Sequence, residues 1–336
     1  MKTILDHSLK AHNTFGIEAR CKRYIEYATA EEAAQVATLP CLKEEPLLII
    51  GGGSNLLLTR DFDGTVVHSA IKGVTPDPEA PTLLRCGSGE IWDKVVEQSL
   101  QMGLYGMENL SLIPGEVGAS AVQNIGAYGM EVAQLIERVE AVEMGTGRQV
   151  TFVNADCQYA YRYSRFKGDW RGRYLITYVT YRLTPDFAPR LDYGNLKAEL
   201  LRQGFAHPTP QQMRQVVIGV RRQKLPDPAV VGNAGSFFMN PVVPKAQYEA
   251  LLAAHPALPC YPASGGNVKI PAGWLIDHAG WKGRRLGQAA VHDRQALVLV
   301  NTGGARGSDI VALCKAIQQD IREKYGIELQ PEVNIL

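Results

Sequence analysis

The chain has 336 residues and a formal net charge of +1, because 35 lysines and arginines nearly balance 34 acidic residues. This length is typical of about two domains of roughly 150 residues each. With no long block of one charge sign, the sequence gives no reason to expect DNA, RNA or an anionic membrane as a partner, so we expect small-molecule ligands.

Signals for targeting, membrane insertion and metal binding are all missing. No apolar run reaches the roughly 18 residues that span a bilayer, and residues 1–7 lack the long apolar stretch of a signal peptide. We therefore expect a cytoplasmic protein. The six cysteines form no C-x-x-C pair, and no two histidines have metal-ligand spacing, so we expect reduced thiols and no metal.

The first half of the chain predicts α+β structure. Thr29-Ala30-Glu31-Glu32 is typical of a capping box before an alanine-rich helix, and residues 46–50 predict a short buried strand that ends in three glycines. A second stretch predicts strands over 65–68 and 82–85, followed by a helix over 91–102 with one apolar face. Alternating apolar residues predict a further strand of this second stretch over 174–183.

Beyond Pro226-Asp227-Pro228 the pattern predicts loops, a helix over 247–254 and a strand over 296–300. The final helix has the clearest pattern, because it combines Ser308 as N-cap with a terminating glycine at 326. Its apolar stripe consists of Ile310, Leu313, Ile317 and Ile321. No internal repeat or low-complexity segment occurs, which excludes solenoids and linkers.

Two glycine-rich segments point to a phosphate-bearing ligand. Gly51-Gly52-Gly53 lets backbone N–H groups approach a ligand, and Ser54 and Asn55 add donors. A diphosphate suits such a turn, although a tight structural turn explains the glycines about as well. Residues 113–129 are rich in small residues and nearly uncharged, so their backbone amides can wrap an extended cofactor. Their length favours FAD over a mononucleotide.

Three places offer groups for chemistry. Ser236 lies between a flexible glycine and two phenylalanines, where its hydroxyl could deliver a proton from a partly dry pocket. Residues 161–167 place cations among aromatic residues, and the residues alone favour a surface loop with guanidinium groups stacked on tyrosines. Glu332 stands near the end of the chain, where a carboxylate is by default solvated.

Six segments match one family in their order along the chain. They are Gly51-Gly52-Gly53-Ser54-Asn55, Ile113-Pro114-Gly115, Gln123-Asn124-Ile125-Gly126-Ala127-Tyr128-Gly129, Arg222-Gln223-Lys224-Leu225-Pro226-Asp227-Pro228, Gly235-Ser236-Phe237-Phe238-Met239-Asn240-Pro241 and Pro331-Glu332-Val333-Asn334. With them the chain resembles the UDP-N-acetylenolpyruvoylglucosamine reductases, flavoenzymes of bacterial cell-wall synthesis. The resemblance runs from Asn13 to Asn334.

The resemblance implies the fold class and a domain division. The fold class is α+β, with a two-part FAD-binding domain of the PCMH or vanillyl-alcohol-oxidase type and a C-terminal α+β substrate-binding domain. The first FAD-binding subdomain would cover residues 1–72 and be joined by the tail 327–336. The second would cover 73–215, and the substrate-binding domain 216–326.

The resemblance also implies roles for individual residues. The catalytic residues would be Arg162, Ser236 and Glu332. The FAD contacts would be Gly51, Gly52, Gly53, Ser54, Asn55, Ile113, Pro114, Gly115, Gly118, Ser120, Asn124, Ile125, Gly126, Ala127 and Tyr128. The substrate contacts would be Tyr161, Tyr193, Lys224, Asn240 and Gln295, with Tyr193 on the mobile loop found in one of the family's two types. Glu116 stands where the family usually has a small uncharged residue.

These roles fit the chemistry that the resemblance implies. Hydride addition to the terminal methylene of an enolpyruvyl ether leaves negative charge on the adjacent carbon and its carboxylate. Arg162 would stabilise that charge, Glu332 would complete the polar cluster, and Ser236 would donate a proton to the same carbon.

The expected function is therefore reduction of UDP-N-acetyl-enolpyruvoylglucosamine to UDP-N-acetylmuramate, a step of peptidoglycan precursor synthesis. NADPH would be the hydride donor and FAD the bound cofactor, and we expect a monomer. One alternative is an FAD-linked oxidase of the same superfamily, although neither glycine segment holds a histidine that could tether the flavin. The other is a UDP-sugar-binding module without chemistry.

Overall fold

The computed structural model describes residues 1–192 and 194–336, so the predicted substrate residue Tyr193 lies outside the described residues. The chain divides into two compact units. Unit 1 comprises Met1–His7, Arg20–Gly53 and Phe62–Arg221, and unit 2 comprises Ser8–Ala19, Ser54–Asp61 and Arg222–Leu336. The expected division at residues 72, 215 and 326 stays a prediction.

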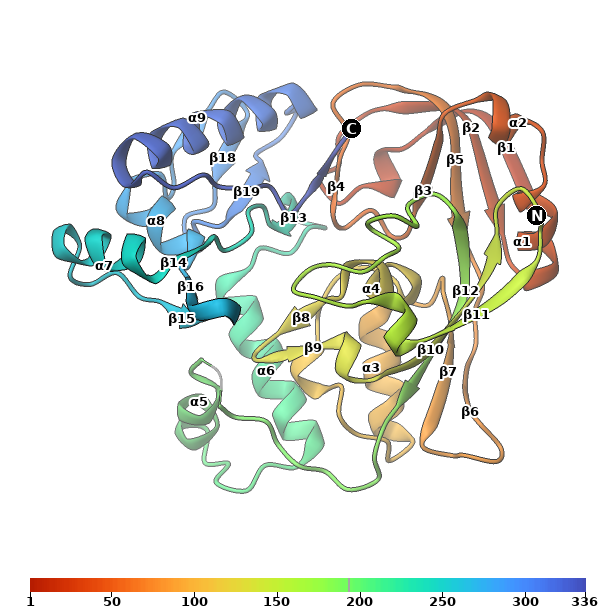
Figure 1. Ribbon diagram of the computed structural model, residues 1–336, viewed down its shortest axis with the longest axis horizontal. Helices are drawn as coiled ribbons and strands as arrows, with labels where there is room; N and C mark the ends of the chain where they lie inside the picture. The colour runs from red at the N-terminus through yellow and green to blue at the C-terminus, as the bar shows by residue number, and fades with distance from the viewer. Residues whose placement is uncertain (193) are drawn as a thin grey trace. The chain divides into compact units, whose positions relative to one another are not determined.

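The first sheet of unit 1 has the strand order β1-β2-β5-β3 (Figure 1). These strands are β1 (Lys2–Ser8), β2 (Arg20–Tyr27), β3 (Leu47–Ile50) and β5 (Phe62–Ser69). β5 pairs in parallel with both β2 and β3, so the expected grouping of strand 65–68 with the second stretch is wrong. Residues 64–67 are buried, as a central parallel strand covered on both faces requires.

Helix α1 (Ala30–Ala37) follows β2, and the short α2 (Cys41–Glu44) precedes β3. The Thr29 hydroxyl accepts the Glu32 N–H at 3.1 Å, which confirms Thr29 as N-cap. The Glu32 carboxylate accepts the amide of Ala28 at 2.7 Å, one residue before the partner that the capping box predicts.

The second sheet of unit 1 is antiparallel, with the order β11-β10-β12-β7-β6. Its strands are β6 (Val74–Pro76), β7 (Leu83–Gly87), β10 (Ile136–Glu143), β11 (Gln149–Val153) and β12 (Tyr174–Arg182). Also present are α3 (Trp92–Gln101), α4 (Val117–Gln123), β8 (Gly126–Ala127), β9 (Met130–Glu131) and the 3-10 turns Glu108–Leu110, Val132–Gln134 and Asn154–Cys157. The predicted strands over 82–85 and 174–183 and the helix over 91–102 are confirmed as β7, β12 and α3.

Four helices of unit 1 have no counterpart in the sequence predictions: the short α2 and α4, and the two helices α5 (Leu196–Arg202) and α6 (Pro210–Lys224). α6 belongs to unit 1 up to Arg221. α6 buries Met213, Val216, Val217 and Val220, and its other positions are mostly polar. The narrow apolar stripe explains why its sequence is a weak helix signal.

Unit 2 contains a four-stranded sheet in the order β13-β19-β18-β17, a three-stranded sheet in the order β14-β16-β15 and the pair β20-β4. The strands are β4 (Leu56–Leu57), β13 (Gly232–Ser236), β14 (Val242–Pro244), β15 (Tyr261–Pro262), β16 (Asn267–Lys269), β17 (Arg285–Leu286), β18 (Ala289–Val291), β19 (Val298–Asn301) and β20 (Asn334–Ile335). The helices are α7 (Lys245–Ala254), α8 (Ala272–His278) and α9 (Gly307–Tyr325), with 3-10 turns over Lys10–His12 and Ser264–Gly266. α7 and β19 confirm the predicted helix over 247–254 and strand over 296–300, with shifts of one or two residues.

Helix α9 ends at Gly326 as predicted, and its whole predicted stripe is buried. Its predicted start at Ser308 is wrong, because Arg306 is the N-cap and Gly307 is already helical. The Asp309 carboxylate accepts the Arg306 amide at 2.8 Å, so a residue inside the helix caps its start. A Cβ on Gly307 would lie 2.0 Å from the Leu58 carbonyl oxygen, so only glycine fits this close approach.

Within the described residues, no helix combines the length and apolarity needed to cross a bilayer, and no group of His, Cys, Asp and Glu side chains could hold a metal ion. In the same part of the chain all six cysteines are free thiols, four of them buried.

Candidate functional site

The turn after β3 packs against the second glycine-rich segment within unit 1. A Cβ on Gly51 would lie 3.0 Å from the Cβ of Ala119 and 3.3 Å from Oε2 of Glu116, and one on Gly52 would lie 3.6 Å from the Cα of Gly115. The turn thus approaches Ala119 and Glu116 so closely at Gly51 that a side chain there would have little room. This half-buried backbone, free of side chains, fits an extended phosphate-bearing cofactor such as FAD.

Part of the second glycine-rich segment is helical. α4 spans Val117–Gln123, and the amides of Val117 and Gly118 donate to the carbonyls of Glu90 and Ser88 at 2.9 and 2.8 Å. These amides are therefore used inside the protein. The amides of Val117 and Gly118 therefore cannot bind a cofactor. The expectation that this segment offers its amides to a cofactor is kept only for residues outside the start of α4.

Two further predicted cofactor residues hold the shape of this segment. The Ser120 hydroxyl lies 3.0 Å from the Tyr181 hydroxyl and is buried. The side-chain amide of Asn124 donates to the Ala160 carbonyl at 2.8 Å, and its oxygen accepts the Ala133 amide at 3.1 Å. Their contact with a cofactor stays a prediction.

The Arg162 side chain reaches the predicted cofactor segment. Its Nη2 donates to the Gly126 carbonyl at 2.8 Å, and its Nη1 donates to the Asn124 carbonyl at 3.4 Å. Its backbone has a positive φ of 55°, a conformation that costs energy for a residue with a side chain. The exposed Tyr161 ring lies 5.3 Å from the guanidinium. Arg162 is therefore directed inward, unlike the surface arginine that the residues alone predict.

Arg165, on the same loop, matches that surface interpretation better. Its guanidinium pairs with the Asp169 carboxylate at 2.6 Å and lies 4.0 Å from the ring centroid of Trp170. The stacking partner is a tryptophan rather than the expected tyrosine.

Arg221 is a candidate that the sequence reasoning missed. Its Nε is buried and has no hydrogen-bond partner among the described residues. Burial lowers the pKa of Arg221, the charges of Tyr128 and Asp93 raise it, and the like charge of Arg162 lowers it further. Asp93 is already bound by Arg214 at 2.6 Å. The signal in the sequence is an arginine four residues after Val217, on the apolar stripe of α6.

In unit 2 the main chain brings Ser236 and Glu332 together. Ser236 ends β13 and is followed by the fully buried Phe237. The Glu332 amide donates to the Phe237 carbonyl at 2.8 Å, and Phe238 forms an antiparallel bridge with Pro331. Glu332 is half-buried, and its part in the site stays a prediction.

Asn55, which belongs to the predicted cofactor segment Gly51–Asn55, contacts the chain around Glu332. Its side-chain amide donates to the Glu332 carbonyl at 3.2 Å, and its own carbonyl accepts the Asn334 amide at 3.1 Å. Three predicted site residues, Asn55, Ser236 and Glu332, thus lie in one region of unit 2.

Asn240 and Gln295 lie beside the start of α8. The Asn240 side-chain oxygen accepts the Ala272 amide at 2.9 Å, and the Gln295 side-chain oxygen lies 3.2 Å from the Cβ position of Gly273. Lys224, the last residue of α6, is exposed.

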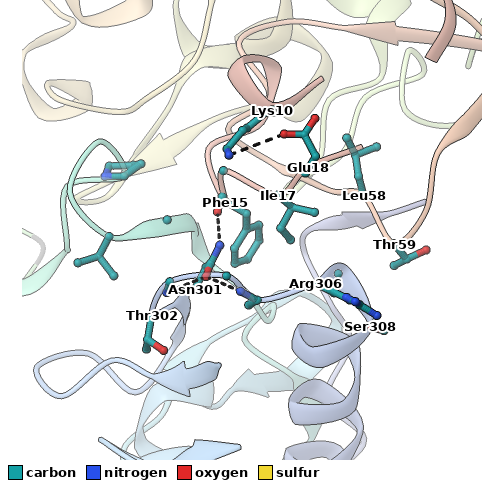
Figure 2. Close-up of a pocket in the computed structure, with 18 of the residues that line it drawn as sticks. Lys10, Phe15, Ile17, Glu18, Leu58, Thr59, Asn301, Thr302, Arg306 and Ser308 are labelled. Atoms are coloured by element: carbon teal, nitrogen blue, oxygen red, sulfur yellow. Dashed lines mark hydrogen bonds and ion pairs between the residues drawn. The ribbon is translucent and has the colours of Figure 1, made fainter. Parts of the chain in front are cut away.

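A cavity of about 860 Å³ lies elsewhere in unit 2 (Figure 2). Its lining comes from residues 10, 15–18, 58–59, 228–232 and 301–308. On its wall the Lys10 ammonium pairs with the Glu18 carboxylate at 3.7 Å. The side-chain amide of Asn301 donates to the Phe15 carbonyl at 2.9 Å. None of the predicted site residues lines this cavity.

Family comparisons cover both units. Residues 21–152 match the family model of an FAD binding domain, and residues 227–336 match the C-terminal domain of UDP-N-acetylenolpyruvoylglucosamine reductase. The solved structure of UDP-N-acetylenolpyruvylglucosamine reductase from Thermus caldophilus has a TM-score of 0.67 over 99% of this chain and 98% of that chain, at 24% identity. The expected fold class is thereby confirmed: an α+β FAD-binding domain followed by a second α+β domain.

Full-length relatives identify the family. The chain is 48% identical over 332 residues to a UDP-N-acetylenolpyruvoylglucosamine reductase of Bacteroides fragilis, covering 98% of this chain and 99% of that protein. It is 49% identical over 338 residues to the protein of the same name from Burkholderia multivorans, covering 97% and 95%. The chain belongs to the UDP-N-acetylenolpyruvoylglucosamine reductases and is an oxidoreductase.

Proposed function

We propose that this protein reduces UDP-N-acetyl-enolpyruvoylglucosamine to UDP-N-acetylmuramate with NADPH as hydride donor and FAD as bound cofactor. It would act as a cytoplasmic monomer in peptidoglycan precursor synthesis. The observation that carries the proposal is the 48% identity to a reductase of that name over nearly the whole chain, which spans both units.

The residues of the chain fit FAD. The Gly51–Gly53 turn offers backbone without side chains, and Arg221 is a cation with a buried nitrogen that has no partner among the described residues. A buried guanidinium nitrogen without a hydrogen-bond partner is unfavourable, so the surroundings of Arg221 suit an anionic ligand that can accept its proton. When bound, FAD would supply the hydride chemistry between NADPH and the enolpyruvyl group.

Arg162 would stabilise the charge that develops on the substrate. The carbonyl groups of Asn124 and Gly126 occupy two of its nitrogens, which holds the plane of the guanidinium. A planar donor set held in one orientation can stabilise a carboxylate and the adjacent carbanion without reorganising during the reaction.

Ser236 would donate the proton. No hydrogen bond to its hydroxyl is found among the described residues, so the hydroxyl can turn toward a substrate carbon. Serine is a poor acid in water, but an enolate-like carbanion is basic enough to take its proton. Glu332, joined to this region through the Phe237 carbonyl, would complete the polar cluster that returns the proton.

Asn240, Gln295, Lys224, Tyr161 and Tyr193 would bind the UDP-sugar. The Asn240 oxygen is occupied by the Ala272 amide, and the Gln295 oxygen accepts the Leu297 amide at 3.3 Å. The side chains of Asn240 and Gln295 therefore each have an NH₂ group that can donate to an anion. Together with the Lys224 ammonium, these donors suit a diphosphate.

The test is an absorbance spectrum of the purified protein, followed by anaerobic addition of NADPH and then of the substrate. We expect a flavin spectrum, bleaching by NADPH and recovery of colour with formation of UDP-N-acetylmuramate. A colourless protein that binds UDP-sugars would favour the binding module. Recovery of colour by oxygen alone, with no product from the enolpyruvyl sugar, would favour the oxidase.

NADPH and the UDP-sugar both carry a diphosphate, so we propose that they occupy one site in turn, near Lys224. Double-reciprocal plots should be parallel, and excess UDP-sugar should inhibit competitively against NADPH. Lys224→Ala should weaken both ligands. Intersecting plots, or an effect on one ligand only, would contradict the shared site.

A further inference from the structure

A carboxylate lies beside the turn that is expected to bind a diphosphate. Glu116 is the N-cap of α4, and its Oε2 is 3.3 Å from the point that a Cβ on Gly51 would occupy. Its Cγ is 3.7 Å from the corresponding point on Gly52. A negative side chain at this place opposes an anionic ligand unless another group neutralises it.

His68 is placed to neutralise this carboxylate. Its Nε2 lies 3.1 and 3.2 Å from the two carboxylate oxygens of Glu116, and its Nδ1 lies 3.1 Å from Oε2 of Glu26. A neutral imidazole donates from only one ring nitrogen, and its other nitrogen would then face a carboxylate with a lone pair. Two carboxylates on opposite sides of the ring therefore favour the doubly protonated imidazolium.

The strand register ties this histidine to the turn. Glu26, His68 and Ile50 are aligned across β2, β5 and β3, and Ile50 is the residue before Gly51. His68 thus lies one strand from the turn, and Glu26 lies one strand further away. The Glu116 carboxylate contacts both His68, through Nε2, and the Cβ position of Gly51 in the turn.

Tyr24 is another titratable side chain beside His68. Its hydroxyl lies 3.0 Å from Nδ1, and the His7 ring lies 4.6 Å from the Tyr24 ring. Burial lowers the pKa of His68, but the hydrogen bonds and charges of Glu116 and Glu26 outweigh it and raise the pKa above the ordinary 6.5. Burial also raises the pKa of Glu26, but the bonds from His68 and Tyr24 lower it overall.

We propose that the proton on His68 controls how strongly the Gly51–Gly53 turn binds the diphosphate of FAD, by cancelling the charge of Glu116. With the proton present, the group of Glu26, His68 and Glu116 carries one net negative charge; without it, the group carries two. This inference rests on the proposed function, because it takes FAD as the ligand of the turn.

Proton binding and FAD binding are then linked. A bound diphosphate favours the protonated histidine and raises its pKa, so the dissociation constant of FAD increases with pH between the two pKa values of His68. One unit charge at this range corresponds to a roughly tenfold change in affinity.

The experiment measures FAD binding to the full chain after removal of its flavin, by quenching of flavin fluorescence between pH 6 and 9. In the unsubstituted protein the dissociation constant should rise by roughly tenfold across this range. Glu116→Gln should bind FAD tightly with little pH dependence. His68→Gln should bind weakly at every pH, near the high-pH value of the unsubstituted protein.

Glu26→Gln is the matched control, because it removes the same charge from the same histidine on the side away from the turn. It should keep the pH dependence but shift its midpoint to lower pH. In a separate readout, the NMR signal of His68, assigned by its loss in His68→Gln, should titrate at higher pH with FAD bound than without it.

A dissociation constant that is the same at pH 6 and pH 9, or a His68 signal that titrates identically with and without FAD, overturns this inference and leaves the proposed function intact. An unchanged pH dependence in Glu116→Gln does the same, because it removes Glu116 from the coupling. Failure of the unsubstituted protein to bind FAD at any pH overturns both the proposed function and this inference.

Discussion

Unit 1 and unit 2 position their predicted catalytic side chains through different kinds of hydrogen bond. In unit 1, Arg162 is held through its own side chain, which donates to the carbonyls of Gly126 and Asn124. In unit 2, Ser236 and Glu332 are held by main-chain hydrogen bonds, including the one from the Glu332 amide to the Phe237 carbonyl. A main-chain anchor survives a side-chain substitution, whereas a side-chain anchor does not. Ser236→Ala therefore tests chemistry alone, whereas substitutions of Arg162 test chemistry and position together.

Ser236→Ala should have the largest effect. We expect reoxidation of the reduced enzyme by the enolpyruvyl substrate to slow by about 10²- to 10⁴-fold, because that half-reaction needs the proton. Reduction by NADPH and the melting temperature should hardly change, since the main-chain pairing remains. Stopped-flow absorbance separates the two half-reactions. An equal loss in both would assign the hydroxyl a packing role.

Arg162→Lys should slow the same half-reaction by about 10²- to 10³-fold even though the charge is kept. A compact ammonium cannot donate to two carbonyl groups and a carboxylate in one plane. Arg165→Lys on the same loop is the control, because Arg165 pairs at the surface with Asp169 and should tolerate the change. Near-normal turnover of Arg162→Lys would remove this arginine from the site.

Gly126→Ala tests the anchor of Arg162 without changing the arginine. The new Cβ would lie 2.8 Å from Nη1 of Arg162 and 2.8 Å from the Met130 carbonyl oxygen. We expect a fall in kcat of roughly 10- to 100-fold from misplacement and a loss of about 1–3 kcal/mol in the free energy of unfolding.

Gly219→Ala, on α6, is the matched control, because no atom lies within 4 Å of its Cβ position. It should leave kcat nearly unchanged and raise the free energy of unfolding by up to about 1 kcal/mol, because alanine is the better helix former. Full activity of Gly126→Ala would mean that the side-chain anchor is unimportant and that the contrast between the units is wrong.

Arg221→Met should stabilise the protein without ligands while weakening FAD binding. Removing a guanidinium whose buried Nε has no hydrogen-bond partner among the described residues should raise the free energy of unfolding by about 1–2 kcal/mol, as urea denaturation would measure. The dissociation constant of FAD for the flavin-free protein, from flavin fluorescence, should rise roughly tenfold.

Arg214→Met, on the same helix, should change the free energy of unfolding in the opposite direction. Arg214 is paired with Asp93 at 2.6 Å, so its loss should destabilise the protein by about 1–3 kcal/mol. Destabilisation by Arg221→Met would contradict the proposal that Arg221 binds an anionic ligand.

Much of the site was recognisable from short segments, but their arrangement was not. Ser236, Arg162 and Glu332 each stand in a motif that the family resemblance identifies. The residues alone could not separate Arg162 from Arg165, because both stand among the same aromatic residues. Their partners in the structure distinguish them: Arg162 donates to the Gly126 carbonyl, and Arg165 pairs with Asp169. Arg221 was missed because its segment was not recognised as a helix with a buried face.

The sequence by itself determined the elements whose signal is local. The stripe of α9 with its final Gly326, the apolar face of α3, and the strand before Gly51 all follow from periodicity and backbone preference within one segment. The tertiary structure decided what depends on distant residues. β5 lies between β2 and β3, α9 begins at Gly307 beside the Leu58 carbonyl, and Glu116 meets His68. These outcomes depend on contacts between residues far apart in the chain, which no pattern within a single segment contains.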